Sequence, residues 1–190
     1  MNRIYLFYSF IFIIGLLLIS SGSNIYAKVI ISTEEDAQLS SQDAVAIILL
    51  SKGDVSITSS NGMIRQAKTK DLLFVGDRLE TRKNGFVQVN FKDGSSLRLS
   101  KNGDFTVDAY HFNEMKKEAK HEISVEQGTL SFIAGKISKI APENYKIKTA
   151  TAVIGIRGSA GEAIITKRSL MARVSKGHKL VIRTPDNIVL

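Results

Sequence analysis

Cysteine is absent from this sequence of 190 residues. The chain therefore forms no disulfide, offers no thiolate ligand to a metal ion and cannot carry a lipoprotein anchor. A domain of this size must be stabilised by packing alone. That composition suits a bacterial envelope or periplasm better than a disulfide-rich animal secretion.

Recognisable catalytic motifs are missing as well. No serine stands in a G-x-S-x-G elbow, no paired carboxylates stand out from the acids of the turns, and no G-K-S/T phosphate loop is present. We predict from these absences that the protein is not an enzyme and binds no cofactor. An envelope enzyme is the alternative, and a cleft that gathers Arg157, His178 or a pair of aspartates would favour it.

The first 27 residues do contain the three parts of a secretory signal. Arg3 supplies a positive charge, residues 4–19 form an apolar run (IYLFYSFIFIIGLLLI), and a polar stretch ends in the small residue Ala27. The run is shorter than the roughly 20 residues that span a bilayer. We predict cleavage after Ala27 and export to the periplasm or cell envelope. An uncleaved membrane anchor is the alternative, and only then would this segment hold the chain in the membrane.

Positive charge exceeds negative charge, because 26 Lys and Arg stand against 18 Asp and Glu for a net charge of +8. Loss of the predicted signal removes only Arg3 and leaves +7. A basic chain invites a nucleic-acid partner. This chain is predicted to be exported, however, and its cations alternate with acids, as at Lys70, Asp71, Asp77 and Arg78. We predict no nucleic-acid partner and leave open an anionic envelope partner, such as lipid headgroups or an acidic polysaccharide.

From residue 46 onward, apolar residues alternate with polar ones and turn signals recur about every 8–12 residues. Asn-Gly or Asp-Gly steps, which favour tight hairpins, begin at positions 61, 84, 93 and 102. The pattern predicts an all-β fold over residues 46–190, an antiparallel, hairpin-rich sandwich or a solenoid-like domain. Residues 28–45 are mostly polar and acidic, and we predict that they form a linker.

Alternation also predicts which side chains enter the core. In residues 86–91 (FVQVNF) we expect Val87, Val89 and Phe91 to face inward and the two polar residues to face water. The aromatic residues are spread about one per strand, as a β core needs, rather than gathered into a sugar-binding platform. Residues 113–121 (NEMKKEAKH) contain helix formers without an apolar stripe, so we predict a solvated loop or hairpin tip there.

Several segments of this β pattern contain more than general turn signals. They are GDVSI at 53–57, VGDRLET at 75–81, NGFVQVNF at 84–91, DGSSLRL at 93–99, GTLSFIAGKI at 128–137 and IKTATAVIGIRGS at 147–159. Read together, these segments resemble the FecR domain. Their order and spacing agree with the family from about residue 46 to residue 185. The last segment is the most specific, because the family there reads glycine, hydrophobic, arginine, glycine and threonine. Ser159 stands in place of that threonine, and Ala150 in place of the usual proline.

The resemblance implies an all-β extracytoplasmic domain. In the best-known members this domain relays a signal from an outer-membrane siderophore receptor to an inner-membrane sigma regulator. Those members carry a cytoplasmic sigma-binding region ahead of one membrane helix, whereas only residues 1–3 precede the apolar run here. We therefore expect a stand-alone exported FecR-domain protein. A membrane-anchored regulator of a sigma or anti-sigma pathway is the alternative.

The family signature falls on ten residues, for which we expect structural roles. They are Gly76, Asp77, Thr81, Gly85, Asp93, Gly94, Gly155, Arg157, Gly158 and Ser159. The last four belong to GIRGS, which could instead cradle a phosphate or carboxylate with backbone N–H groups and one guanidinium. We favour the structural reading, in which Gly155 and Gly158 allow close backbone approach and Arg157 pairs with a carboxylate or caps carbonyls.

Histidines and turn aspartates are potential metal ligands, but we do not expect either group to bind a metal ion. His111 and His121 flank the polar loop and lack a third ligand, so we predict solvated imidazoles instead of a zinc site. The third histidine of the sequence is His178. The aspartates that adjoin glycines lack the D-x-D/N-x-D/N-G spacing of a calcium loop. We expect each to bond its own turn; they are Asp54, Asp77, Asp93 and Asp104.

Taken together, these features predict a non-enzymatic binding or interaction protein of the bacterial cell envelope. Its partner is expected to be an envelope protein or a polysaccharide. The sequence does not identify which one, and it predicts no metal site.

Overall fold

The computed structural model describes residues 43–157, 160–175 and 179–184. The predicted signal peptide (1–27) and nearly all of the predicted linker (28–45) lie outside these residues, so both stay predictions. In the described part, β-strands dominate, and the two helical segments are the short helix α2 (Ile137–Ile140) and the 3-10 turn η1 (Pro142–Asn144). The prediction of an all-β fold is confirmed.

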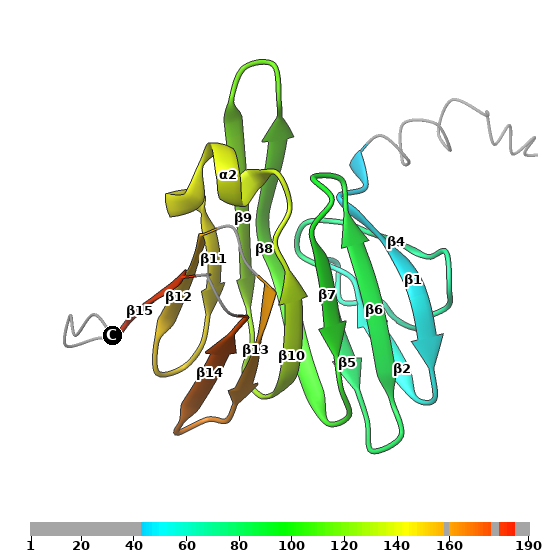
Figure 1. Ribbon diagram of the computed structural model, residues 1–190. Helices are drawn as coiled ribbons and strands as arrows, with labels where there is room; N and C mark the ends of the chain where they lie inside the picture. The colour runs from blue at the N-terminus through cyan, green and yellow to red at the C-terminus, as the bar shows by residue number, and fades with distance from the viewer. Residues whose placement is uncertain (1–42, 158–159, 176–178, 185–190) are drawn as a thin grey trace, which may run out of the picture. The chain divides into compact units, whose positions relative to one another are not determined.

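The strands form two sheets (Figure 1). Sheet A contains β1 (Ala46–Lys52), β4 (Leu72–Leu73), β6 (Phe86–Phe91), β7 (Ser96–Leu99), β10 (Gly128–Ile133), β13 (Ala160–Ile165) and β14 (Leu170–Val174). Sheet B contains β2 (Val55–Thr58), β3 (Ile64–Gln66), β5 (Arg78–Thr81), β8 (Gly103–Asn113), β9 (Glu118–Ser124), β11 (Tyr145–Lys148), β12 (Val153–Arg157) and β15 (Lys179–Arg183).

The order of strands in both sheets follows the chain. Sheet A reads β4-β1-β6-β7-β10-β13-β14 and sheet B reads β3-β2-β5-β8-β9-β11-β12-β15, so only the first two strands of each are exchanged. The chain crosses between the sheets every one or two strands and adds each new strand on the same side. The fold is a two-layer sandwich that grows like a flattened solenoid, and the two predicted alternatives describe one architecture.

One pair among the described strands departs from the predicted antiparallel arrangement. Strands β9 and β11 run parallel, with His121 opposite Tyr145 and Ile123 opposite Ile147. The intervening strand β10 lies in sheet A, so the chain returns to sheet B through α2 and η1 rather than through a tight hairpin. A parallel neighbour requires such a crossover connection.

The hydrophobic core lies between the sheets and forms one cluster. Val87, Val89 and Phe91 are at most 4% exposed, as the alternation in β6 predicts, while Gln88 and Asn90 lie half-buried on the outer face. Sheet B supplies the other half of the core from residues such as Leu79, Phe105, Val107, Ile123, Ile147 and Ile154. One contiguous core across both layers makes the two sheets a single packing unit.

The polar segment 113–121 is only partly the predicted hairpin tip. Strand β8 extends to Asn113 and β9 begins at Glu118, so residues 114–117 alone form the tip. Lys117 adopts a positive φ of 55° within it. The remaining residues pair with β8, with Ala119 opposite Phe112 and His121 opposite Tyr110. Pairing with a neighbouring strand outweighs the weak helix propensity of these residues.

Candidate functional site

The first two signature residues, Gly76 and Asp77, stabilise a turn and do not form a ligand site. Gly76 has a φ of +90°, and a side chain there would press against Ser60. The carboxylate of Asp77, which is 3% exposed, accepts a hydrogen bond from the N–H of Phe74 at 3.0 Å. Burial raises the pKa of Asp77, and the hydrogen bond from Phe74 opposes that rise. The aspartate bonds its own turn, as predicted for it.

Thr81 and Gly85 also have structural roles, because each lies where two backbone segments pack closely together. The Thr81 hydroxyl donates to the Ser100 carbonyl at 2.6 Å and accepts from the Gly103 N–H at 3.0 Å. A Cβ on Gly85 would overlap the carbonyl oxygen of Asp54. Both residues therefore act where neighbouring chain segments meet closely.

Asp93 and Gly94 form the turn between β6 and β7, and Asp93 also anchors a buried polar cluster. Gly94 has a φ of +82°. The carboxylate of Asp93, which is 2% exposed, accepts from the Ser95 hydroxyl at 2.6 Å and from the Ile137 N–H at 3.3 Å. The N–H of Asp93 donates to the Tyr110 hydroxyl at 2.7 Å. This one residue thus joins β6, β7, β8 and the start of α2.

His121 completes this buried polar cluster and overturns the prediction that it is solvated. Its side chain is fully buried, and its ring centroid lies 4.2 Å from that of Phe91 and 4.5 Å from that of Tyr145. Its Nδ1 lies 3.4 Å from the hydroxyl of Ser95. Burial lowers the pKa of His121 to about 4, while the charge of Asp93 opposes the change. The alternation Ala119, His121, Ile123 was the signal that could have predicted this position.

The cluster resembles a hydrolytic triad in composition but not in geometry. In a triad the histidine stands between serine and aspartate, so that it can take the serine proton. Here Ser95 stands between Asp93 and His121, and each of the three is at most 2% exposed. No substrate reaches these atoms in this arrangement. We assign the cluster to the stability of the sandwich.

The other candidate metal ligands are dispersed. His111 pairs with Lys120 rather than His121, so the two histidines of the hairpin point to opposite faces. His111 lies 3.7 Å from Glu118 at the surface, whereas His178 lies outside the described residues. No group of three or more His, Asp or Glu in the described ranges is arranged to hold a metal ion.

Asp54 and Asp104 do not bond their own turns, which corrects the prediction for these two aspartates. The Asp104 carboxylate accepts from the N–H of Glu126 at 2.9 Å and lies 3.3 Å from Arg78. The Asp54 carboxylate lies 3.7 Å from Arg82 at the surface. Asp104 therefore ties β8 to the segment that follows β9, a long-range contact that the local Gly-Asp sequence does not reveal.

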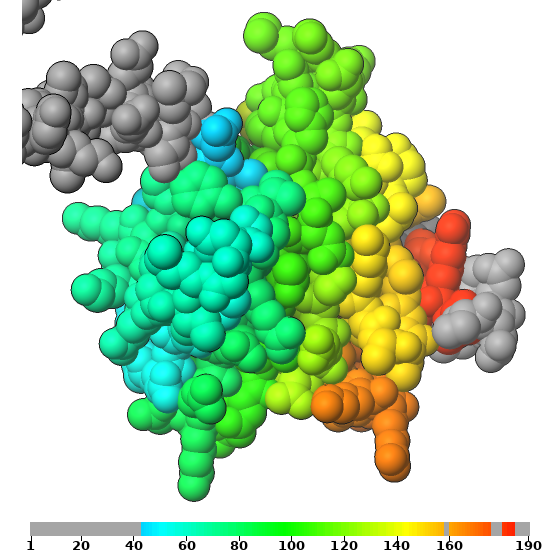
Figure 2. Space-filling view, turned by 180° about the vertical axis from the view of Figure 1, so that it is seen from behind, coloured from blue at the N-terminus to red at the C-terminus, as the bar shows by residue number. Residues whose placement is uncertain are grey.

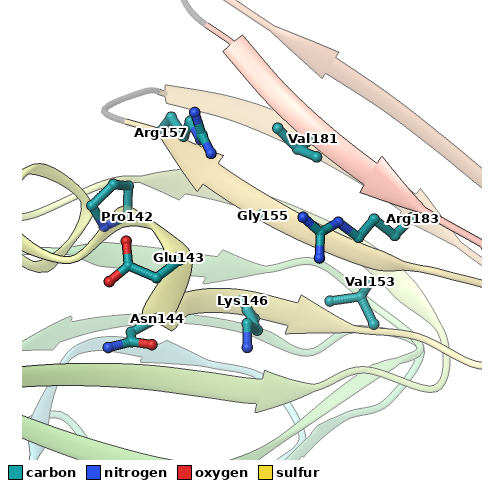
Figure 3. A pocket seen from close by; sticks show the side chains of 9 residues that line it. All are labelled: Pro142, Glu143, Asn144, Lys146, Val153, Gly155, Arg157, Val181 and Arg183. Atoms are coloured by element: carbon teal, nitrogen blue, oxygen red, sulfur yellow. The ribbon is translucent and has the colours of Figure 1, made fainter. Parts of the chain in front are cut away.

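A groove on the outer face of sheet B brings the signature residues Gly155 and Arg157 to the surface (Figure 3). It has a volume of about 200 Å³ and is lined by Pro142, Glu143, Asn144, Lys146, Val153, Gly155, Arg157, Val181 and Arg183. Strand alternation explains the lining, because Ile154 and Ile156 are buried and the residues between and beside them on β12 point outward. Figure 2 shows this end of sheet B, where η1 and β11 (yellow) lie near β15 (red) at the surface.

Three cations surround the floor of this cationic groove. Gly155 pairs with Lys146 on one side and with Val181 on the other, while Arg157 follows two residues along β12. Arg183 on β15 pairs with Val153. Arg157 and Arg183 are exposed, and Lys146 is half-exposed. Within the described lining, Glu143 is the single acid.

Gly155 keeps the centre of the groove open. A Cβ added there would meet its nearest neighbour, the Val181 carbonyl oxygen, at 3.6 Å, which is ordinary contact. The prediction that Gly155 permits a close backbone approach is therefore wrong, and the consequence of the glycine is an open floor. Gly158 and Ser159 lie outside the described residues. The hypothesis that GIRGS binds a phosphate or carboxylate can therefore be compared with the structure only at Gly155 and Arg157.

A second hollow of about 390 Å³ continues the cationic groove toward the end of β11. The two hollows share Lys146, Val153 and Arg183, and the second also reaches Lys148 and Thr149. Lys148 contacts Glu122 at 2.9 Å and Asp108 at 3.5 Å.

The carboxylate of Glu122 meets more positive charge than it can neutralise. Besides Lys148, it lies 3.5 Å from Lys120 and 3.6 Å from Lys146. The hydrogen bond from Lys148 lowers the pKa of Glu122. Three lysines therefore share this acid and Asp108, and positive charge remains in excess beside the groove.

Comparison with known proteins gives three findings. A family model described as FecR protein matches residues 77–186, more than half of the chain. No curated protein matches the chain. A solved structure titled "Cell surface anchoring domain" is 30% identical over 32% of this chain and 80% of its own length, with a TM-score of 0.31.

The matched range begins at β5, yet the sandwich begins earlier. Strand β1 pairs with β6 and β2 pairs with β5, so the strands before residue 77 belong to the same sheets as the matched ones. Among the described residues, no helix is long and apolar enough to cross a bilayer. Of the eight signature residues that lie in the described ranges, only Gly155 and Arg157 are brought together in a surface groove.

Proposed function

This chain belongs to the FecR family, and we propose on that premise that it is a non-enzymatic binding protein of the bacterial cell envelope. The family is envelope-associated and serves regulation and sensing, and it is not known for enzymes. The cationic groove over β11, β12 and β15 is the observation that carries the proposal. Its ligand would be an anionic component of the envelope.

The chemistry of the groove suits an anion. Guanidinium groups offer several N–H donors in a planar fork that matches carboxylate and phosphate oxygens. Arg157 and Arg183 supply two such groups from neighbouring strands, and Lys146 adds a third cation across the open floor. Cations gathered around one concave surface reinforce each other's attraction for a ligand.

A cation at the opposite end of the same sheet is instead surrounded by acids. Arg78 on β5 lies 3.4 Å from Glu80 and 3.3 Å from both Asp104 and Glu126. Acids thus outnumber this cation, and they would repel an anion. The contrast supports the late end of sheet B as the binding surface.

A paired set of variants tests the proposal. Arg157→Gln with Arg183→Gln removes two cations from the groove, whereas Arg98→Gln with Arg173→Gln removes two from sheet A. Binding of the full exported chain to bacterial envelope fractions is measured by co-sedimentation at low and at physiological salt. We expect the groove pair to weaken binding about tenfold and the sheet A pair to leave it near the wild-type level, with wild-type binding falling as salt rises.

Equal binding by the two paired variants would count against the groove. Export is tested separately by mass spectrometry of the mature N-terminus. A chain that starts at Lys28 supports cleavage after Ala27 and an exported binding protein. Retention of residues 1–27 would favour the membrane-anchored regulator instead.

A further inference from the structure

We propose that the cationic groove binds an extended acidic polysaccharide, along several sugar units, rather than a compact anion. The inference rests on the proposed function, because it requires that the groove be the binding surface. Its evidence is the arrangement of the cations, the length of the groove and the composition of its floor.

The cations are spread along the strands in three rows. Arg157 lies in the first row, Lys146 lies beside Gly155 in the second, and Arg183 lies beside Val153 in the third. Successive rows are two residues apart, or about 6.6 Å, so the outer rows are about 13 Å apart. A line of charges at this spacing matches a ligand that carries repeated negative groups.

The hollow is also too long for one small ion. The first part measures about 200 Å³ and the second about 390 Å³, and they join at Lys146, Val153 and Arg183. A chain that crosses from the Arg157 end to the Lys148 end would occupy both parts.

The floor favours a polar chain over a membrane or a stacked ring. It is formed by small or half-buried residues, Val153, Gly155 and Val181, and no aromatic residue lines either hollow in the described part. An acidic glycan can lie across such a floor and be held by charge at its edges. A bilayer would instead need protruding apolar side chains, and none of the large exposed apolar residues of the described part, such as Met63, Met115 and Met171, lines either hollow.

The test uses oligogalacturonates of defined length. The full exported chain is titrated with the monomer, dimer, tetramer and hexamer, with inorganic phosphate, with neutral dextran oligomers and with anionic phospholipid vesicles. We expect affinity to rise at least about tenfold from monomer to hexamer, because linked charges bind together. Phosphate and dextran should bind weakly, and the vesicles no better than neutral ones.

Two variants assign the length dependence to the groove. Arg157→Gln should reduce hexamer binding severalfold and monomer binding little. Gly155→Val keeps every charge but fills the open floor, so it should also weaken the hexamer. Arg98→Gln on sheet A is the matched control. Unchanged melting temperatures would show that all three variants fold.

The outcomes separate this inference from the proposed function. If the monomer, the hexamer and phosphate bind equally well and all lose affinity with Arg157→Gln, the groove binds a compact anion and the polysaccharide inference is overturned. Vesicle binding that depends on Arg157, without oligomer binding, would overturn it in favour of lipid headgroups. If no anion binds through the groove, the proposed function fails as well.

Discussion

The buried polar cluster around Asp93 and the cationic groove around Gly155 both contain signature residues, but they place polar groups in opposite surroundings. In the cluster, Asp93 and His121 are at most 2% exposed and their partners come from within the sandwich. In the groove, Arg157 is exposed, and it lies with Lys146 and Arg183 around an open floor. One family signature therefore combines residues that are buried inside the sandwich with residues that line an open surface groove.

Asp93→Ala should have the largest effect on stability. It leaves the Ser95 hydroxyl and the Ile137 N–H without their acceptor in a buried site. We expect the free energy of unfolding to fall by about 3 kcal/mol, measured by urea denaturation. Asp54→Ala removes a surface aspartate that also adjoins a glycine, and it should change stability by less than about 0.5 kcal/mol. Equal effects would contradict the assigned role of the buried cluster.

Acid should destabilise the protein through His121. Its pKa is about 4 in the folded state and near 6.5 when unfolded, so the unfolded chain binds more protons between these values. Stability is therefore lost as pH falls through this window, by at most about 1.4 kcal/mol per pH unit. Unfolding curves at pH 7, 6, 5 and 4 measure it.

His121→Phe should flatten this pH dependence, because a phenyl ring takes up no proton. His111→Phe should leave the dependence unchanged, since the His111 side chain is 59% exposed and lies at the surface. A wild-type protein whose stability does not change between pH 7 and 4 would show that His121 is not held neutral by burial.

Two signature glycines, one at a tight backbone contact and one on the groove floor, should respond differently to the addition of a single methyl group. Gly85→Ala forces a Cβ against the Asp54 carbonyl and should cost about 1–3 kcal/mol. Gly155→Ala meets only ordinary contacts and should be neutral or slightly stabilising, by up to about 0.5 kcal/mol. Thermal unfolding measures both changes. A large loss at Gly155 would restore the close-approach role predicted for it.

Removing charge from the groove should have the smallest effect on stability. Arg157→Gln with Arg183→Gln changes two exposed side chains on the outer face. We expect the free energy of unfolding to stay within about 0.5 kcal/mol of the wild type, while anion binding falls. Chemical denaturation and the co-sedimentation assay, performed on the same preparation, check this separation. A marked loss of stability would place the two arginines with the structural residues.

Local signals account for much of what the sequence predicts correctly. The strand at residues 86–91 and its inward residues follow from alternation, and the turns at Gly76 and Gly94 follow from the need for a positive φ. The site was less predictable. The GIRGS motif predicts part of the groove lining, but Gly155 does not have the close backbone approach predicted for it. No local pattern distinguishes Lys146 or Arg183 from the other surface cations.

The sequence by itself determined the all-β class, the places of most strands and turns, and the resemblance to the FecR family, because each depends on residues close together in the chain. Only the tertiary structure decided that His121 is buried and that Lys146, Arg157 and Arg183 share one groove. Between β12 and β15 the chain crosses to sheet A to form β13 and β14, then returns to pair beside Gly155. Such a pairing is selected by packing between two sheets, which no local pattern records.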